Sequence, residues 1–185
     1  MSLRVIGGAA RGRRLKSVPG DTTRPVMDRV KEALFNILAG DVIDSKWWDI
    51  FAGTGAIGIE ALSRGAAFVK FTDLNRAPVE TIRDNVEHCR FSGQAEIKRG
   101  DAFTMLAGRA DKVFEYIYVA PPQYKGMWLE AVKLIDDHID WLSGDGTVIV
   151  QIDPSEYEAV ELVNLTVGEE RKYGNTLLVF YDRAG

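Results

Sequence analysis

The sequence predicts an α/β fold, a doubly wound and mostly parallel sheet of seven strands whose last two strands form an antiparallel hairpin. Three observations predict it. From residue 47 onward, short apolar runs alternate with helical patterns across short connections. The chain ends in two β-type runs around the turn residues 172–175. Its 185 residues, 46% hydrophobic and 27% charged, suit one domain with a sizeable core.

Residues 1–40 are predicted to form an N-terminal extension of the main domain, 41–185, and not a second domain. Two extended runs, Leu3–Ile6 and Arg13–Val18, flank a glycine-rich turn, which predicts a basic hairpin. Residues 19–25 break this pattern with two prolines and a glycine. A helix is then expected over 27–39, where Gly40 ends it.

The main domain is predicted as an alternation of strands and helices. Apolar runs indicate strands over 47–51, 68–72, 95–98, 113–119 and 147–152, and helical periodicity indicates helices over 56–64, 76–90 and 127–139. The closing antiparallel pair is expected over 162–166 and 177–181. Trp47 and Trp48 are interpreted as packing residues, and Asp136, Asp137 and His138 as a solvated face.

The charge distribution is uneven along the chain. Residues 1–31 hold eight basic and two acidic groups, a net charge of +6, and the remainder holds 15 basic and 25 acidic groups, a net charge of −10. Screening limits the reach of each charge to about 8 Å at physiological salt, so phosphate groups respond to the local patch. This predicts a nucleic-acid-binding arm, with a solvated, solubilising arm as the alternative.

Several protein classes are excluded. The apolar runs 145–152 and 176–181 are far too short to span a bilayer. The first residues lack the apolar core of a signal peptide, so we expect the protein to stay in the cytoplasm. The single cysteine, Cys89, permits neither an internal disulfide nor a zinc cluster, which agrees with a reducing compartment and predicts no metal.

Ligands of such sheets bind beyond the carboxyl ends of the strands, and the first loop there carries a glycine motif. Gly53, Gly55 and Gly58 form a G-x-G-x-x-G pattern, which suits a dinucleotide or S-adenosylmethionine equally. The alternative is tight strand–helix packing without a ligand. Asp49, just before the glycines, can hold the ammonium group of a cofactor, directly or through water.

The second and third loops each carry an acidic residue. Asp73 lies twenty residues beyond Gly53, where a carboxylate can accept hydrogen bonds from both hydroxyls of a ribose. Asp101 can meet an adenine amino group, with the next backbone N–H, that of Ala102, serving the ring. For both acids the alternative is the N-cap of the helix that follows.

The fourth loop reads Ala120-Pro121-Pro122-Gln123-Tyr124. The two prolines fix an extended backbone and remove two N–H donors, which leaves carbonyl acceptors facing the predicted cofactor site. A row of carbonyl acceptors suits the hydrogens of an exocyclic amine, and Tyr124 can stack on a base. A plain strand-to-helix turn is the alternative.

Seven short motifs run through nearly the whole chain: residues 4–8, 23–25, 28–32, 34–36, 49–55, 60–66 and 173–176. With these motifs the chain resembles the RsmD-type bacterial methyltransferases, which modify the N2 amine of a guanine in small-subunit (16S) ribosomal RNA. The N-terminal motifs are the more specific ones, because the glycine loop occurs in many methyltransferases.

The resemblance implies a Rossmann-like class I methyltransferase domain over 41–185 that uses S-adenosylmethionine, with ribosomal RNA or an assembling small subunit as partner. It implies cofactor contacts from Asp49, Phe51, Gly53, Gly55, Asp73, Leu74, Asp101 and Ala102. It implies RNA contacts from Arg4, Arg11, Arg13, Arg14, Lys16, Arg24 and Arg29. The fourth loop, Ala120 to Tyr124, takes the catalytic position.

The chain departs from the family at that fourth loop, where the family has Asp or Asn, two prolines, then Phe or Tyr. Here Ala120 supplies no side-chain acceptor, and Tyr124 stands one place late behind Gln123. Loss of one hydrogen bond to the reacting amine costs about 1–3 kcal/mol, or about 5- to 150-fold in rate. Two alternatives follow: a methyltransferase for another nucleic-acid or protein amine, and a cofactor- or rRNA-binding homologue with impaired catalysis.

Overall fold

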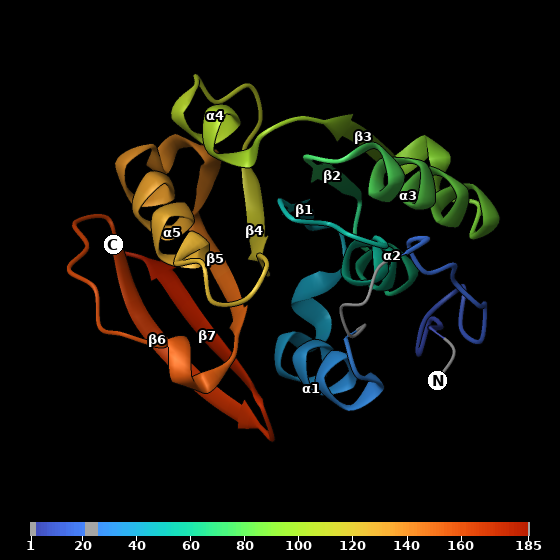
Figure 1. The fold of residues 1–185 in the computed structure, drawn as a ribbon, viewed down its shortest axis with the longest axis horizontal. Coiled ribbons are helices and arrows are strands. Elements are labelled where there is room, and N and C mark those ends of the chain that lie inside the picture. The colour runs from blue at the N-terminus through green and yellow to red at the C-terminus, as the bar shows by residue number, and fades with distance from the viewer. Residues whose placement is uncertain (1–2, 21–25, 185) are drawn as a thin grey trace. The chain divides into compact units, whose positions relative to one another are not determined.

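The computed structural model describes residues 3–20 and 26–184 of the chain (Figure 1). Its internal contacts divide it into two compact units, residues 1–100 and 101–185. Arg24, predicted to contact RNA, lies outside the described residues. The boundary predicted at residue 40 does not coincide with this division and stays a prediction about the domain organisation.

The first unit contains three parallel strands, in the order β3-β2-β1. Its elements are α1 (Asp28–Leu38), β1 (Lys46–Asp49), α2 (Ala56–Ser63), β2 (Phe68–Asp73), α3 (Arg76–His88) and β3 (Ala95–Arg99). The register pairs Asp49 with Phe71 and Asp73 with Arg99, so all three strands end at the same edge. The loops after β1 and β2 therefore lie at that edge, as predicted.

Two tryptophans form the centre of the first unit. Trp47 and Trp48 are both fully buried on β1, which confirms their interpretation as packing residues. The ring of Trp47 stacks on Phe35 of α1 with centroids 5.6 Å apart. The Nε1–H of Trp48 donates to Oγ1 of Thr72 at 3.2 Å, so the buried indole keeps a hydrogen-bond partner.

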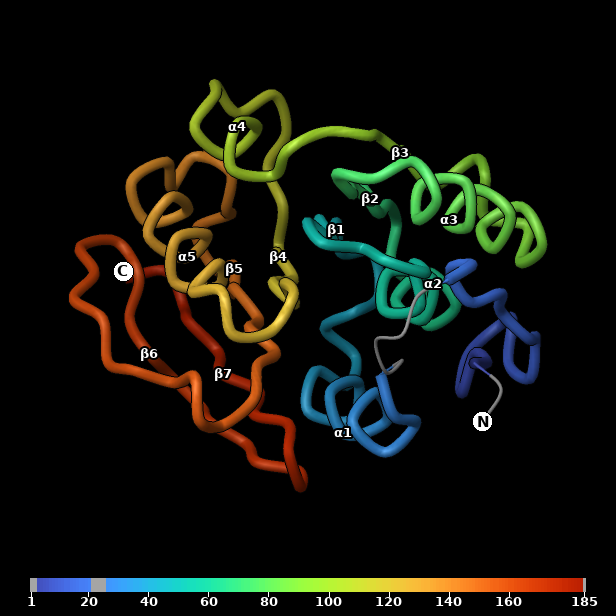
Figure 2. The backbone as a smooth tube through the Cα atoms, viewed as in Figure 1, coloured from blue at the N-terminus to red at the C-terminus, as the bar shows by residue number. Residues whose placement is uncertain are grey.

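The predicted N-terminal hairpin is present in a reduced form. The N–H of Val5 donates to the carbonyl of Arg13 at 2.9 Å, and that of Leu15 to the carbonyl of Leu3 at 2.8 Å. A single bridge joins Arg4 and Arg14, in place of two full strands. Figure 2 shows this segment, the blue tube, running beside α2 and α3. Its apolar side chains Leu3, Val5, Ala10, Leu15 and Val18 are buried, so the hairpin is packed and is not a loose arm.

The second unit contains four strands, in the order β4-β5-β7-β6. Its elements are α4 (Ala102–Ala107), β4 (Phe114–Val119), α5 (Met127–Asp137), β5 (Leu142–Ile152), β6 (Leu165–Tyr173) and β7 (Thr176–Arg183). β4 and β5 are parallel, whereas β7 pairs antiparallel with both β5 and β6. The predicted seven strands with an antiparallel last hairpin are confirmed.

The predicted start of the closing hairpin, at residue 162, is wrong because a buried acid holds the preceding segment. Asp136 is 5% exposed, and its carboxylate accepts hydrogen bonds from the N–H groups of Val163, Asn164 and Leu165 at 2.7–3.0 Å. The ladder of β6 therefore begins only at Leu165 and runs to Tyr173. The prediction of a solvated face is likewise wrong for Asp136. Among the described residues, no helix is long and apolar enough to cross a membrane.

Candidate functional site

The carboxyl ends of β1 and β2 bring the first two predicted loops together within the first unit. The N–H of Gly53 donates to Oδ2 of Asp73 at 3.1 Å, and the N–H of Asn75 donates to Oδ1 of the same carboxylate at 3.1 Å. Asp73 thus ties its own loop to the glycine loop. A carboxylate has about four acceptor sites, so it can accept hydrogen bonds from several donors at once.

The three glycines of the motif have different roles. Gly53 and Gly55 both have left-handed backbones, with φ of +58° and +82°, and a Cβ added at Gly53 would meet no atom within 4 Å. The backbone at Gly53 is therefore open to close approach by a ligand. At Gly58 a Cβ would lie 2.3 Å from Cε1 of Phe71. The third glycine serves helix–strand packing, which was the predicted alternative for the motif.

Asp49 is an almost completely buried acid at the end of β1, 2% exposed. Its pKa is raised to about 7, chiefly because burial disfavours the charged form; a hydrogen bond from the backbone N–H of Gly58 acts to lower the pKa, and repulsion by Asp73 acts to raise it. Because this pKa is close to physiological pH, the carboxyl group ionises readily when a cation binds beside it. This chemistry fits the predicted contact with an ammonium group.

Two apolar residues complete the cofactor prediction in the first unit. Leu74 follows Asp73 directly and is 61% exposed, an unusual position for a leucine at the end of a buried strand. Its carbonyl accepts a hydrogen bond from Nε of Arg99 at 3.3 Å, which fixes the loop backbone. Phe51 is half-buried in the glycine loop. Their contacts with a cofactor stay predictions.

In the second unit, Asp101 acts as a helix cap. Its carboxylate accepts the N–H of Phe103 at 3.0 Å and the hydroxyl of Thr104 at 3.3 Å at the start of α4. Ala102 is the buried first residue of that helix. Capping was the predicted alternative for Asp101, and the adenine contacts of Asp101 and Ala102 stay predictions.

The loop after β4 is fastened to the loop after β5. The N–H of Tyr124 donates to Oε1 of Glu156 at 2.8 Å, and its hydroxyl donates to Oδ2 of Asp153 at 3.1 Å. The hydrogen bond to Asp153 raises the pKa of the Tyr124 hydroxyl. Ala120 and Pro121 are half-buried, whereas Pro122, Gln123 and Tyr124 are exposed.

Asp153 and Glu156 were not predicted as part of the site. They form a capping box around the short 3₁₀ helix Pro154–Glu156, in which Asp153 accepts the N–H of Ser155 at 2.9 Å. The pattern of an acid, two residues and a glutamate after a strand is a sequence signal that could have identified them. Through this box, the orientation of the Tyr124 ring depends on two acids about thirty residues further along.

The N-terminal segment is clamped to α2 by a buried acid that the sequence did not reveal. Glu60 is fully buried, and its carboxylate accepts the N–H groups of Ile6 at 3.0 Å and Gly7 at 2.9 Å. It also pairs with Nζ of Lys31 at 3.3 Å and with Nε of Arg64 at 2.8 Å. Lys31 was counted toward the basic arm, but it is completely buried and offers no charge to a partner.

Ser63, one turn beyond Glu60, anchors the tip of the hairpin. Its hydroxyl donates to the carbonyl of Gly7 at 2.6 Å and accepts the N–H of Ala10 at 2.9 Å. Its carbonyl accepts the N–H of Ala9 at 2.8 Å. A Cβ at Gly8 would lie 1.9 Å from that carbonyl oxygen, so only glycine fits there. The specific N-terminal motifs therefore encode a docked hairpin.

The basic residues of the hairpin differ in what they can offer. Arg11 and Arg14 are exposed. Arg4 pairs with Asp28 at 3.3 Å and Lys16 with Asp84 at 3.4 Å, both near the surface, where such pairs are weak.

Arg13 is half-buried and donates to the carbonyl of His88 at the end of α3 at 2.9 Å, so part of its role is structural. Arg29 is exposed on α1. Their RNA contacts stay predictions.

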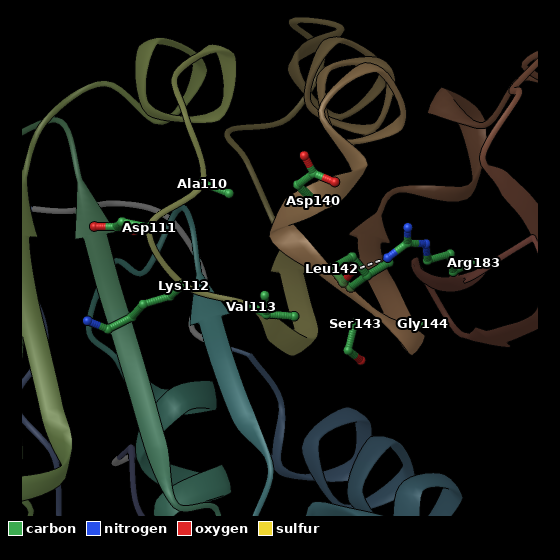
Figure 3. A pocket seen from close by; sticks show the side chains of 9 residues that line it. All are labelled: Ala110, Asp111, Lys112, Val113, Asp140, Leu142, Ser143, Gly144 and Arg183. Carbon is green, nitrogen blue, oxygen red and sulfur yellow. Dashed lines mark hydrogen bonds between the residues drawn. The ribbon is translucent and has the colours of Figure 1, made fainter.

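Within the second unit, a shallow hollow of about 510 Å³ lies apart from the loop that follows β4. Its lining includes Val113, just before β4, and Leu142, which begins β5, so it belongs to the amino ends of those strands. Figure 3 shows Arg183 turned toward Leu142, to whose carbonyl it donates at 2.6 Å, and Lys112 pointing away from Arg183. None of the predicted site residues line this hollow.

Comparison with known proteins then places the chain in a family. Residues 3–182 match the family described as "Conserved hypothetical protein 95". The chain belongs to this family. It is 35% identical over 186 residues to "Putative rRNA methyltransferase YlbH" of Bacillus subtilis, covering 99% of this chain and 100% of that protein. It is 32% identical over 181 residues to "Ribosomal RNA small subunit methyltransferase D" of Escherichia coli K12, covering 98% and 90%.

A solved structure of the family agrees with the fold. "Putative methyltransferase yhhF from Escherichia coli" superimposes with a TM-score of 0.85 at 33% identity, covering 99% of this chain and 98% of that one. The predicted membership of the RsmD-type family is confirmed, and with it the Rossmann-like class I methyltransferase fold. The prediction that the chain is a methyltransferase of this family is confirmed as well.

Proposed function

We propose that this protein transfers a methyl group from S-adenosylmethionine to the exocyclic N2 amine of a guanine in small-subunit ribosomal RNA. The observation that carries the proposal is the joining of Asp49, Gly53 and Asp73 at the ends of β1 and β2. It is supported by two relatives that the chain matches over nearly their whole length, one named as a putative rRNA methyltransferase and the other as a small-subunit rRNA methyltransferase. Ribosomal subunits are built in the cytoplasm, which is where we place the reaction.

The residues at this edge of the first unit fit such a cofactor. The backbone at Gly53 is open where a side chain would otherwise stand. Asp49 supplies a buried carboxyl for an ammonium group, and Asp73 supplies an acceptor for ribose hydroxyls. When bound there, S-adenosylmethionine supplies an electrophilic methyl group on a sulfonium sulfur.

The residues of the first unit act by binding and orientation. Asp49 gives up its proton and then holds the ammonium group by charge, while the N–H of Gly58 stabilises the carboxylate. Asp73 keeps the glycine loop in its open shape through the N–H of Gly53. Holding a reactant in place in this way lowers the barrier chiefly by proximity, so these residues need no acid–base role.

The loop after β4 orients the acceptor. Pro121 and Pro122 have no N–H groups, so their stretch of backbone offers only carbonyl acceptors to the hydrogens of an amine. The bond from Tyr124 to Asp153 fixes the ring that would stack on the guanine. As the N–C bond forms, the bond between the methyl group and sulfur would break and leave a neutral thioether. The amine proton would become acidic only then and would pass to water, so the reaction needs no strong general base at its start. Ala120 offers no side-chain acceptor, so orientation of the amine rests on the backbone.

RNA binding is assigned to the docked hairpin within residues 1–40, which we retain as an extension of the methyltransferase domain 41–185. The exposed cations of the hairpin are Arg4, Arg11, Arg14 and Lys16, and Arg29 is exposed on α1. Phosphate groups dominate the affinity of such contacts. The docking of the hairpin by Glu60 and Ser63 gives these charges a fixed arrangement, as expected for a surface that meets a folded RNA or an assembling subunit.

A methyl-transfer assay tests the proposal. Small ribosomal subunits and 16S rRNA from a strain without the enzyme serve as substrates, with radiolabelled S-adenosylmethionine and mapping of the product. We expect methylation at guanine N2, and we expect Ala120→Asp to accelerate it by about 5- to 150-fold.

Two other outcomes would contradict the proposal. Transfer only to a different RNA, DNA or protein amine would assign the altered fourth loop to a changed substrate. Tight cofactor binding without turnover in the wild type, with turnover restored in Ala120→Asp, would identify an impaired homologue that binds its ligands without efficient catalysis.

A further inference from the structure

One buried side chain on α3 links the N-terminal hairpin to the glycine loop. Asn85 is 1% exposed. Its Nδ2 group donates to the carbonyl of Lys16 at 3.0 Å and to the carbonyl of Thr54 at 2.9 Å, and its Oδ1 accepts the N–H of Lys16 at 2.7 Å. All three partners are backbone groups of two other segments, so the amide of Asn85 acts as a link between those segments.

The two residues that Asn85 links belong to the two proposed binding surfaces: Thr54 to the glycine loop for the cofactor, and Lys16 to the hairpin for RNA. Thr54 lies between Gly53 and Gly55, whose left-handed backbones set the direction of its carbonyl. The side chain of Lys16 is 71% exposed, and its ammonium group forms a surface pair with Asp84. Such a pair is weak and exchanges readily. The backbone of Lys16 is therefore held by Asn85 while its ammonium group is open to a phosphate.

We propose that Asn85 is a positioning residue that couples the RNA-facing hairpin to the cofactor loop, so that occupation of one surface strengthens binding at the other. The proposal rests on the proposed function, because it assigns RNA to the hairpin and S-adenosylmethionine to the glycine loop. It adds cooperation between the two sites, since the two ligands need not touch each other to influence each other.

The physical basis is the shared hydrogen-bonding group. A ligand that fixes the Thr54 carbonyl restricts the amide of Asn85, and the restricted amide holds Lys16 through two bonds at once. Coupling between binding sites is reciprocal, so the cofactor and the RNA must each strengthen the binding of the other by the same factor. Because the N–H of Lys16 donates to Asn85, the coupling also predicts that the cofactor alone protects this amide from exchange. The cofactor direction can be measured without any RNA.

Hydrogen exchange of the full-length protein tests the coupling, with S-adenosylhomocysteine as the probe ligand. In the wild type we expect saturating ligand to slow exchange in residues 50–58 and also, by about fivefold or more, at the amide of Lys16. Slowing in 50–58 without any change at Lys16 would overturn the coupling while leaving the proposed cofactor site intact. No binding of the ligand at all would instead overturn the proposed function.

Two variants on α3 separate the link from the general stability of the helix. Asn85→Asp keeps an acceptor for the N–H of Lys16 and removes both donated bonds, so ligand should still slow exchange in 50–58 but change Lys16 less than about twofold. Thr81→Val is the matched control, because the buried hydroxyl of Thr81 bonds to the carbonyl of Ala77 within the same helix. It should retain the full effect, and equal loss in both variants would overturn the assignment to Asn85.

A third measurement tests the effect of RNA on the affinity for the cofactor analogue. A 16S rRNA transcript should tighten S-adenosylhomocysteine binding by about fivefold or more in the wild type and in Thr81→Val, and less than about twofold in Asn85→Asp. If the transcript binds and the affinity for S-adenosylhomocysteine is unchanged in the wild type, the coupling is wrong even though both ligands are correctly assigned.

Discussion

The carboxylate of Glu60 and the ammonium group of Lys31 lie 3.3 Å apart with both side chains completely buried. Such a buried pair is expensive to desolvate, so its stability depends on the further hydrogen bonds that both groups make. Glu60 also accepts two N–H groups of the N-terminal segment, and Lys31 donates to the carbonyl of Arg4. The pair therefore fixes where the hairpin sits on the first unit.

Replacing Glu60 alone is expected to destabilise the protein more than replacing both members of this pair. Glu60→Gln leaves Lys31 buried opposite a neutral amide, and we expect a loss of about 3–5 kcal/mol in the free energy of unfolding. The double variant Glu60→Gln with Lys31→Met removes the stranded charge and should recover part of that loss. Urea unfolding measures both, and a double variant less stable than Glu60→Gln would contradict this account.

The contact between Gly8 and Ser63 predicts a difference between two glycine substitutions. Gly8→Ala places a Cβ against the Ser63 carbonyl at a φ of +80°, whereas Gly12→Ala has a φ of +86° and nothing within 4 Å. Backbone strain alone costs about 1–2 kcal/mol, and overpacking adds about 1–3 kcal/mol. Thermal unfolding should therefore show a clearly lower Tm for Gly8→Ala than for Gly12→Ala, and equal Tm values would exclude the contact.

Asp49 predicts a pH dependence of both stability and ligand binding. Its pKa in the folded protein, about 7, lies above the ordinary value of 3.8, so the folded state retains a proton that the unfolded state has lost. Ionisation of Asp49 therefore does not reduce the free energy of unfolding below pH 3.8, but it reduces this free energy as the pH rises through 7. The total reduction is no more than about 4 kcal/mol. Urea unfolding of the wild type between about pH 5 and 8 should show this slope, and Asp49→Asn should lack it.

The same carboxyl should make cofactor binding stronger at higher pH. A ligand with an ammonium group requires the ionised form, so S-adenosylhomocysteine should bind about tenfold more weakly at pH 6 than at pH 8. Calorimetry across this range gives the Kd values directly. A pH-independent Kd in the wild type would show that Asp49 does not face the ammonium group.

The exposed arginines of the hairpin predict a selective loss of RNA affinity. Arg11→Glu with Arg14→Glu should weaken binding of a 16S rRNA transcript. It should also reduce the salt dependence of binding. The slope of log binding constant against log salt concentration should become shallower by about 1 for each phosphate group that is no longer neutralised. Cofactor affinity should not change. Arg14 is a better choice than Arg13, because Arg13 also caps α3 through the carbonyl of His88.

A charge-matched control uses two exposed cations of the second unit, Arg109→Glu with Lys133→Glu. This variant should keep RNA affinity near the wild-type value. Equal weakening in both double variants would mean that net charge, and not the hairpin, determines the interaction.

Much of the fold was predictable because its signals are local. The alternation of apolar runs located each strand of the parallel part, although β5 begins at Leu142, five residues before the predicted start. Trp47 and Trp48 were correctly interpreted as packing residues. The proximity of Asp73 to the glycine loop was predictable because its spacing from Gly53 is a feature of the strand–loop–helix unit. Its bond to the N–H of Gly53 then follows from that unit.

The residues that sequence reasoning missed have partners far along the chain. Glu60 bonds to residues more than fifty positions away, and Asn85 to Lys16 at a separation of 69. Neither distance corresponds to a helical or strand period, so no pattern marks these side chains as buried. Asp136 was misjudged for the same reason, since its three amide partners lie on the approach to β6.

The position of Asp136 has a consequence for the growing polypeptide. Its carboxylate ends up among three amides that are synthesised only 27–29 residues later. Until Leu165 has left the ribosome, α5 therefore carries an acid that has to remain in water, and the helix cannot settle into its final environment. The second unit should consequently mature late in translation, and a nascent chain stalled before that point would remain an easy substrate for proteases.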